Sequence, residues 1–169
     1  MNTRKTVTVT LLIASLFAFS GCKLVDTAKE TYGAIVKKFK SDTLPTQTIV
    51  LKTKQAEITM LVETADDVDE REQGLMERTQ LEEGKGMIFI YEDEAPRAFW
   101  MKNTKIPLDV IFFSSKHEVV SIVPTMTPCN VAQCPSYGST EPAMYALEVP
   151  AGWTNTRGVA VGDRFDFKE

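Results

Sequence analysis

Three carboxylates in the second half of the chain, Asp109, Glu141 and Glu148, have side chains suited to acid–base catalysis. Two carboxylates that face each other across a cleft, about 5 to 9 Å apart, can act as acid and base in glycoside hydrolysis. Positions along the chain do not determine that separation. The three residues are therefore weak catalytic candidates, and they define one hypothesis, a carbohydrate hydrolase.

Glu148 also has a simpler interpretation. It lies in an apolar run of strand length, in which Leu147 and Val149 share one face. If that face enters the core, Glu148 points away from it. Glu148 would then be solvated or paired with an arginine, for which Arg71 and Arg97 are candidates.

The segment that begins at Phe99 combines an aromatic ring with polar groups. In a strand, Phe99 and Met101 face one way while Trp100 and Lys102 face the other. If the first pair enters the core, Trp100 stands beside Lys102 on the opposite face. An exposed tryptophan next to polar side chains is a suitable floor for a ligand pocket.

The residues after this strand add further polar groups. Asn103 starts a turn that Pro107 holds, and Asp109 follows two residues later. The alternative is structural: Trp100 packs under a helix, and Asn103 hydrogen-bonds the backbone of its turn. The binding interpretation names as ligand contacts Trp100, Lys102, Asn103, Asp109, Tyr137 and Arg71, with Trp153 as a further aromatic candidate.

Cys129 and Cys134 are separated by four residues in a loop bounded by prolines. An even pair of cysteines in an exported protein favours a disulfide, which would add roughly 2 kcal/mol by constraining the unfolded chain. Metal binding with His117 as third ligand is the rival, but zinc sites need three or four ligands at recognisable spacings. We expect a disulfide, no metal and no cofactor.

Composition and missing motifs exclude several classes of function. The chain has 19 Lys and Arg against 23 Asp and Glu, a net charge of −4, whereas nucleic-acid binders usually present a basic face. The single histidine, His117, excludes HExxH zinc sites. No G-x-S-x-G sequence occurs, and Gly84-Lys-Gly86 lacks the spacing of a phosphate-binding loop.

Many short strands are expected to position these residues. They are predicted at 47–53, 56–63, 87–91, 99–102, 108–113, 119–123, 143–149 and 164–167. Turns are predicted between them at 92–96, 114–116, 124–138, 150–152 and 162–163. The pattern predicts a mainly β (α+β) domain over 49–169, an antiparallel sandwich or barrel.

One short helix is predicted near residues 65–75. Thr64 can cap it, the acidic residues that follow suit a helix N-terminus, and Gly74 would end it. Val68, Leu75 and Met76 would supply a narrow apolar face.

The first 22 residues have the layout of an export signal. Arg4 and Lys5 precede a thirteen-residue, mostly apolar run, too short for a membrane span of roughly 20 residues. Phe19-Ser20-Gly21-Cys22 resembles the lipobox of bacterial lipoproteins, which implies cleavage of residues 1–21 and lipid on Cys22. Cleavage removes two basic residues, so 17 face 23 acidic ones and the net charge becomes −6. An ordinary secretory signal is the alternative.

Residues 22–48 are predicted to be a tether. Apolar residues from Leu24 to Phe39 recur at helical spacing, and the helix would lie on the membrane or dock on the domain. A linker with Pro45 follows. Lys23 is not the aspartate that retains lipoproteins in the inner membrane of enterobacteria, which favours the outer membrane.

A series of motifs resembles one known family. Residues 71–78 (REQGLMER) lead to Gly86-Met-Ile-Phe89, then to FWMKNT at 99–104 and IPLD at 106–109. Cys134-Pro-Ser-Tyr137, Glu148, Ala151-Gly152 and Gly162-Asp163 complete the series. Order and spacing resemble the DUF192 family, domains of unknown function 192, over about residues 55–167. The resemblance implies a mainly β, sandwich-like fold with one helix and no particular activity.

Three function classes follow. The first is a lipid-anchored, non-enzymatic module of the bacterial envelope that binds a glycan or an envelope protein, with Trp100, Tyr137 and Trp153 as aromatic contacts. The second is the hydrolase, acting on envelope carbohydrate. The third is an accessory subunit without a small ligand. We expect the first, facing the periplasm or the cell exterior.

Overall fold

The computed structural model describes residues 44–168. The predicted signal peptide, the lipidation site Cys22 and most of the tether lie outside the described residues. The first strand begins at Thr46, so the last three residues assigned to the tether belong to the domain.

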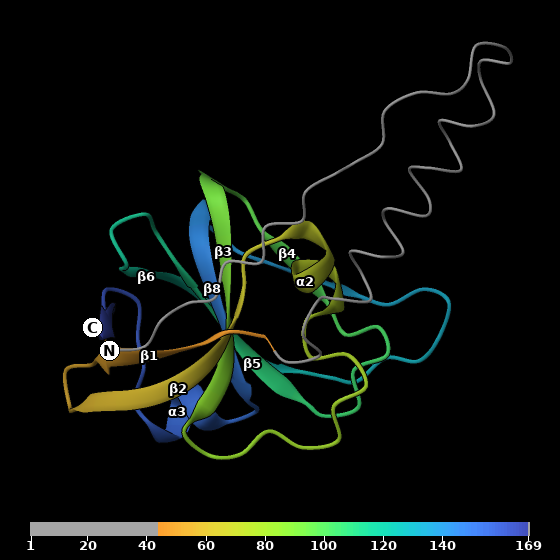
Figure 1. The fold of residues 1–169 in the computed structure, drawn as a ribbon, viewed down its shortest axis with the longest axis horizontal. Helices are drawn as coiled ribbons and strands as arrows, with labels where there is room; N and C mark the ends of the chain where they lie inside the picture. Colours follow the sequence, from red (N-terminus) through yellow and green to blue (C-terminus); the bar gives the residue numbers. More distant parts are fainter. Residues whose placement is uncertain (1–43, 169) are drawn as a thin grey trace, which may run out of the picture. The chain divides into compact units, whose positions relative to one another are not determined.

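The described chain is mostly strand (Figure 1). Its elements in chain order are β1 (Thr46–Lys52), β2 (Glu57–Ala65), α2 (Val68–Gln73), β3 (Lys85–Ala95), β4 (Ala98–Trp100), β5 (Leu108–Phe113), β6 (Val119–Met126), β7 (Ser136–Gly138), β8 (Ala143–Pro150), α3 (Trp153–Thr156) and β9 (Arg164–Lys168).

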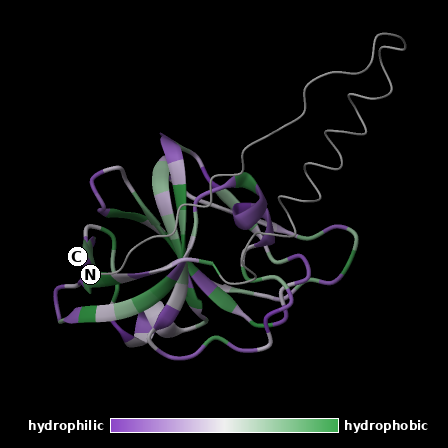
Figure 2. Cartoon of the chain, viewed as in Figure 1, coloured by the Kyte–Doolittle hydropathy of each residue, from purple (hydrophilic) through white to green (hydrophobic). Residues whose placement is uncertain are grey.

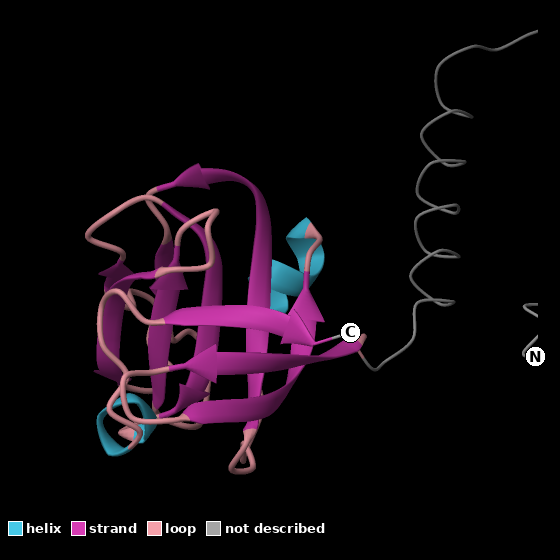
Figure 3. Cartoon of the chain, turned by 90° about the vertical axis from the view of Figure 1, so that its left-hand side faces the viewer, coloured by secondary structure: helices cyan, strands magenta, loops and turns pink. Residues whose placement is uncertain are grey.

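Seven of the strands form one curled sheet in the order β6-β5-β8-β3-β2-β1-β9. Only β2 and β3 pair in parallel, and the connection through α2 is the crossover that a parallel pair requires. The two edges approach each other where Val119 N donates to Asp163 O at 2.7 Å and Phe165 N donates to His117 O at 3.0 Å. The result is a barrel-like sheet (Figure 3), as the sequence predicts, but it is mixed instead of wholly antiparallel because α2 connects β2 to β3.

Apolar residues lie on both sides of the central strands. The side enclosed by the curl, here called the inner core, includes Ile49, Leu51, Met60, Val62, Ile88, Ile111, Phe113, Leu147, Val149, Trp153 and Phe165. The other side, the outer core, includes Met87, Phe89, Val110, Phe112 and Ala146, with Leu75, Phe99, Met101 and Cys129 packed over them. Figure 2 shows hydrophobic residues along the strands and hydrophilic ones along α2.

A two-stranded ribbon of β4 and β7 covers the outer core. Phe99 holds it there, because its ring lies 4.9 Å from that of Phe89 and 5.6 Å from that of Phe112, both edge to face. Each such pair contributes about 1 kcal/mol beyond area burial. The ribbon therefore gives the sheet a second layer on its outer side.

Two predicted turns contain strand. β3 continues to Ala95, because Asp93 pairs with Arg97 and the Glu94 carboxylate accepts from Ser115 N at 2.6 Å. The acidic residues predict a turn, but they form the exposed end of a strand. In the long predicted loop at 124–138, β6 extends to Met126 and β7 forms at the far end.

The helix prediction is right in place and wrong in detail. Asp67 is the N-cap, and its carboxylate accepts from Glu70 N at 2.8 Å. Thr64 is instead buried at the end of β2. Val68 is 62% exposed and takes no part in an apolar face, whereas Leu75 is buried just beyond Gly74, which ends the helix as expected. A second helix, α3, follows the predicted turn at 150–152.

Candidate functional site

The strand β4 presents Trp100 on the surface. Phe99 and Met101 are buried in the outer core, as the alternation predicts, and Trp100 on the opposite face is 50% exposed. The structural alternative, in which Trp100 packs under a helix, is wrong. The three predicted contacts Trp100, Lys102 and Asn103 therefore lie together on one short segment.

Main-chain hydrogen bonds fix the turn that follows. Asn103 has φ 56°, a left-handed conformation that asparagine tolerates better than most residues. Its N–H donates to Cys129 O at 2.9 Å, and its carbonyl accepts from Glu77 N at 2.9 Å. Cys129 N donates in turn to Met101 O at 3.1 Å. The turn is thus held by two segments distant in sequence.

The side chains of this turn remain available. The Lys102 ammonium lies 5.1 Å from the centre of the Trp100 ring, within range of a cation–π contact. Among residues 44–168 no carboxylate pairs with Lys102, whereas nearby Lys105 pairs with Glu77 at 2.6 Å. The Asn103 side chain is exposed and makes no hydrogen bond to any described residue. A tryptophan ring and an ammonium thus lie side by side, and an exposed amide follows at the next residue.

The predicted cysteine pair supports the same segment. The sulfur atoms of Cys129 and Cys134 lie 2.10 Å apart and their Cα atoms 5.8 Å apart, a separation that suits a disulfide. Cys129 is buried against the outer core, and Val131 between the two cysteines is exposed. The pair closes the loop whose ends contact the Asn103 turn and β4.

Two aromatic candidates lie elsewhere. Tyr137 on β7 pairs directly with Phe99, so its side chain shares the face toward the outer core, and its hydroxyl lies 3.3 Å from Thr127 Oγ1. Trp153 is 7% exposed and belongs to the inner core. The prediction of a surface contact is wrong for Trp153, whereas Tyr137 is only partly buried and stays a predicted contact.

Asp109 is buried and satisfied rather than part of a pocket. Oδ1 accepts from Thr125 N at 2.8 Å and from Gly152 N at 3.0 Å. Oδ2 accepts from Thr154 N at 3.0 Å and from Thr154 Oγ1 at 2.7 Å. Burial alone would raise the pKa of Asp109, but these hydrogen bonds outweigh it and lower the pKa. Asp109 fixes the start of α3 and the end of β6, which corrects its assignment as a ligand contact.

Glu148 is buried, contrary to the prediction of a solvated residue. It is 4% exposed on β8 between Met87 of β3 and Val110 of β5. No hydrogen bond or ion pair to its carboxyl group occurs among the described residues. Burial raises the pKa of Glu148 to about 8, so the group is mostly protonated at neutral pH.

The carboxylates do not form a catalytic pair. Asp109 pairs with Val149, and Val110 pairs with Glu148, so the two acidic side chains point to opposite faces of the sheet. Glu141 is exposed in the loop before β8. The structure therefore does not bring together the acid and base that the hydrolase hypothesis needs.

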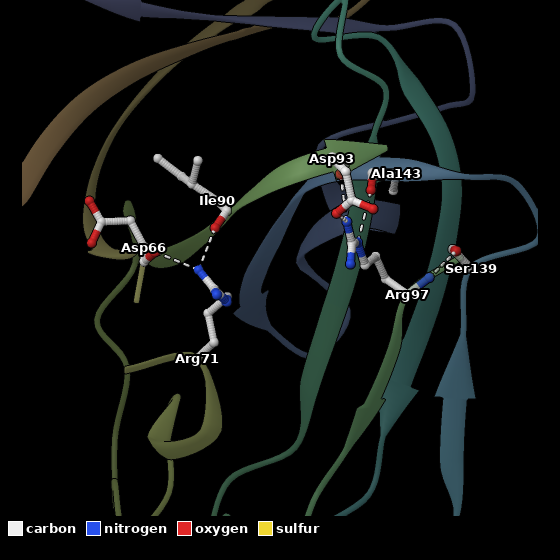
Figure 4. A network of polar contacts seen from close by, with 7 residues as sticks. All are labelled: Asp66, Arg71, Ile90, Asp93, Arg97, Ser139 and Ala143. Atoms are coloured by element: carbon white, nitrogen blue, oxygen red, sulfur yellow. Dashed lines mark hydrogen bonds and ion pairs between the residues drawn. The ribbon is translucent and has the colours of Figure 1, made fainter. Parts of the chain in front are cut away.

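Arg71 bonds the middle of β3 and Arg97 bonds its far end, and neither forms an ion pair with Glu148 (Figure 4). Arg71 Nη1 donates to Asp66 O at 2.5 Å and to Ile90 O at 2.9 Å. Arg97 Nε donates to Ala143 O at 3.0 Å, and its Nη2 pairs with Asp93 at 2.6 Å. Arg71 thus ties α2 to β3, and it is not part of the Trp100 segment.

The sequence did not point to Tyr91, whose ring contacts both arginines. The Arg97 and Arg71 guanidinium groups lie 3.9 Å and 5.1 Å from the centre of its ring. Burial raises the pKa of Tyr91, and Glu148 adds a smaller upward effect against the two arginines. Its place two residues beyond Phe89 on the same strand face was the available signal.

No group of three or more His, Cys, Asp or Glu among residues 44–168 could hold a metal ion. No helix in this part of the chain is long and apolar enough to cross a membrane.

Comparisons with known proteins agree with the fold. The family model DUF192, described as "Uncharacterized ACR", matches residues 49–167. A crystal structure from Sinorhizobium meliloti, of a protein provisionally assigned as a transcription regulator, is 34% identical with a TM-score of 0.70. It matches over 75% of this chain and 97% of that one.

A second crystal structure, of a protein of unknown function from Novosphingobium aromaticivorans, is 28% identical with a TM-score of 0.70. The match covers 75% of this chain and 89% of that one. A search of curated proteins finds none that matches this sequence.

Proposed function

Because the chain belongs to the DUF192 family, whose function is not established, we propose from its own geometry that it is a non-enzymatic binding module of the bacterial cell envelope. It is anchored by lipid on Cys22 and contacts its ligand through Trp100, Lys102 and Asn103. The observation that carries the proposal is the half-exposed Trp100 ring on a turn fixed by main-chain hydrogen bonds.

The proposed ligand contact is supported by the fixed backbone of the segment that carries Trp100. An exposed aromatic ring binds a partner well when little conformational entropy is lost on binding. Here the backbone on both sides of Lys102 is bonded to the Cys129 loop and to Glu77. The proposed disulfide between Cys129 and Cys134 would restrict that loop further.

The hydrolase is the weaker candidate. Glycoside hydrolysis requires two carboxyl groups on either side of one sugar ring. Asp109 accepts four hydrogen bonds on one face of the sheet, and Glu148 lies buried on the other. This arrangement gives no support to paired-carboxylate catalysis.

Regulation of transcription is not carried over from the Sinorhizobium protein. Binding to DNA depends on phosphate contacts by lysine and arginine. This chain has a net charge of −4, and −6 after the proposed cleavage. A lipid anchor would also keep the domain outside the cytoplasm.

The anchor is tested in the cell. Cys22→Ser is expected to move the protein from the membrane fraction to the soluble fraction, and mass spectrometry of the wild-type N-terminus should find lipid on Cys22. Wild-type protein that carries no lipid, together with unchanged membrane association of the variant, would reject the anchor.

The ligand contact is tested with the full chain in detergent. Cosedimentation with purified cell-wall sacculi should weaken about tenfold, equivalent to 1.4 kcal/mol, for Trp100→Ala. Val161→Ala, which shortens an exposed apolar side chain elsewhere, is the matched control and should bind as wild type. Equal binding by both variants, with unchanged melting temperatures, would reject the proposed contact.

A further inference from the structure

Lys102 is the one lysine among residues 44–168 whose ammonium lies over an aromatic ring. Lys52, Lys85 and Lys105 each have a carboxylate within 2.9 Å. Lys102 has none, and its ammonium is held against the indole of Trp100. The Lys102 ammonium has no carboxylate partner and lies beside an exposed ring, so it can pair with an anionic group of a ligand.

The groups around Lys102 limit what kind of anion fits. Lys105 is neutralised by Glu77, and Arg78 by Glu63 at 2.6 Å. One positive charge without a carboxylate partner is therefore present at this turn, next to the Trp100 ring and one residue before the exposed Asn103. Binding to an anionic membrane surface usually depends on a cluster of several lysines and arginines, each contributing about 1 kcal/mol.

We propose that the ligand of the Trp100 turn is an acidic saccharide, whose sugar ring stacks on Trp100 while its carboxylate pairs with Lys102. Asn103 donates and accepts hydrogen bonds with neighbouring hydroxyl groups through its unbonded side-chain amide. This inference rests on the proposed binding function and assigns it a substrate class.

Two polymers with the same sugar backbone, one charged and one neutral, test whether binding depends on the carboxylate of the saccharide. The full chain in detergent is titrated with polygalacturonate and with its fully methyl-esterified form, which lacks the carboxylate charge. Wild type should bind polygalacturonate at least about tenfold more tightly. Lys102→Gln should abolish that preference and retain binding to the ester, whereas Trp100→Ala should weaken binding to both polymers.

Lys54→Gln is the matched control, since it removes one exposed positive charge away from the turn. It should leave the preference unchanged, and Lys102→Arg should retain it. All variants should melt within about 2 °C of wild type, because the changed side chains are not core residues.

Three results would overturn the inference. The first is equal affinity of wild type for the two polymers, and the second is an unchanged preference in Lys102→Gln. The third is binding to phosphatidylglycerol vesicles, but not to polygalacturonate, that is lost in Lys102→Gln, which would assign the turn to the membrane. Each of these results is compatible with weaker sacculus binding by Trp100→Ala, whereas equal sacculus binding by wild type and Trp100→Ala would reject the proposed function itself.

Discussion

Asp109 of β5 and Glu148 of β8 lie on paired strands. Asp109 is opposite Val149, the residue after Glu148, so the two carboxyl groups face opposite sides of the sheet. Asp109 points to the inner side, where α3 and the end of β6 supply four hydrogen bonds to its carboxylate. Glu148 points to the outer side between Met87 and Val110, and no described residue bonds its carboxyl group. Both are buried, yet the pKa of Asp109 is lowered and that of Glu148 is raised.

The difference shows that burial alone does not determine the charge of an acidic side chain. A carboxylate remains ionised in the interior when backbone N–H groups are aimed at it, and becomes a neutral acid when they are absent. The inner side of the sheet is therefore organised by a charged group, and the outer side tolerates a neutral one. The following experiments test that contrast.

The largest effect is expected for Asp109→Ala. The change leaves the N–H groups of Thr125, Gly152 and Thr154 without their acceptor inside the protein, so the free energy of unfolding should fall by about 3 to 5 kcal/mol. Urea denaturation measures it, with the exposed Glu141→Ala as control. A loss below about 1 kcal/mol would show that these bonds do not organise the inner side.

Glu148 should give stability a dependence on pH. The unfolded carboxyl group ionises near its ordinary pKa of 4.5 and the folded one near 8, so the folded state binds more protons between these values. The free energy of unfolding therefore decreases as pH rises, by about 3 kcal/mol between pH 5 and 7.5.

Glu148→Gln should remove most of this decrease, because glutamine does not ionise. Urea denaturation of both proteins at pH 5, 6.5 and 7.5 measures the slopes. Parallel slopes would mean that Glu148 is ionised in the folded state and that the contrast with Asp109 does not hold.

Removing the cysteine pair should act on the outer side alone. In Cys129→Ser/Cys134→Ser the free energy of unfolding should fall by about 2 kcal/mol. Hydrogen exchange at the N–H groups of Asn103 and Cys129 should accelerate, while exchange at Thr154 remains as in wild type. A wild type that contains two free thiols on titration would contradict the proposed disulfide.

The smallest effect is expected for Arg71→Lys. Lysine cannot reproduce the planar donor group that bonds Asp66 O and Ile90 O, so about 1 kcal/mol of stability should be lost. Arg78→Lys, at an exposed ion pair, should change stability by less than about 0.5 kcal/mol. Equal effects would show that Arg71 is an ordinary surface residue.

The sequence predicts much of the sheet because alternation and β-branched residues determine strands locally. β5 begins and ends where predicted, and the faces of Phe99, Trp100 and Met101 follow from the two-residue repeat. Alternation also shows that Glu148 lies opposite Leu147. It does not show that a second layer buries that face, because that layer depends on contacts with β4 and β7.

The partners of Asp109 could not be predicted for the same reason. Gly152 and Thr154 are 43 and 45 residues away, and they reach Asp109 only through the pairing of β5 with β8. The sequence predicts Trp153 as a surface aromatic because composition does not reveal which side of a helix is covered. The location of Trp100 could be predicted because its two neighbours are both strongly apolar.

The incomplete closure of the sheet has a consequence for self-association. A few hydrogen bonds near His117, Val119 and Phe165 connect one end of β6 to β9. Elsewhere the two strands are the edges of the sheet in the described structure. Open edges can pair with another copy of the chain and start aggregation. Here Pro124 removes an N–H donor from β6, and Asp166 and Lys168 place charges along β9. These features disfavour pairing of either edge with a second copy of the chain.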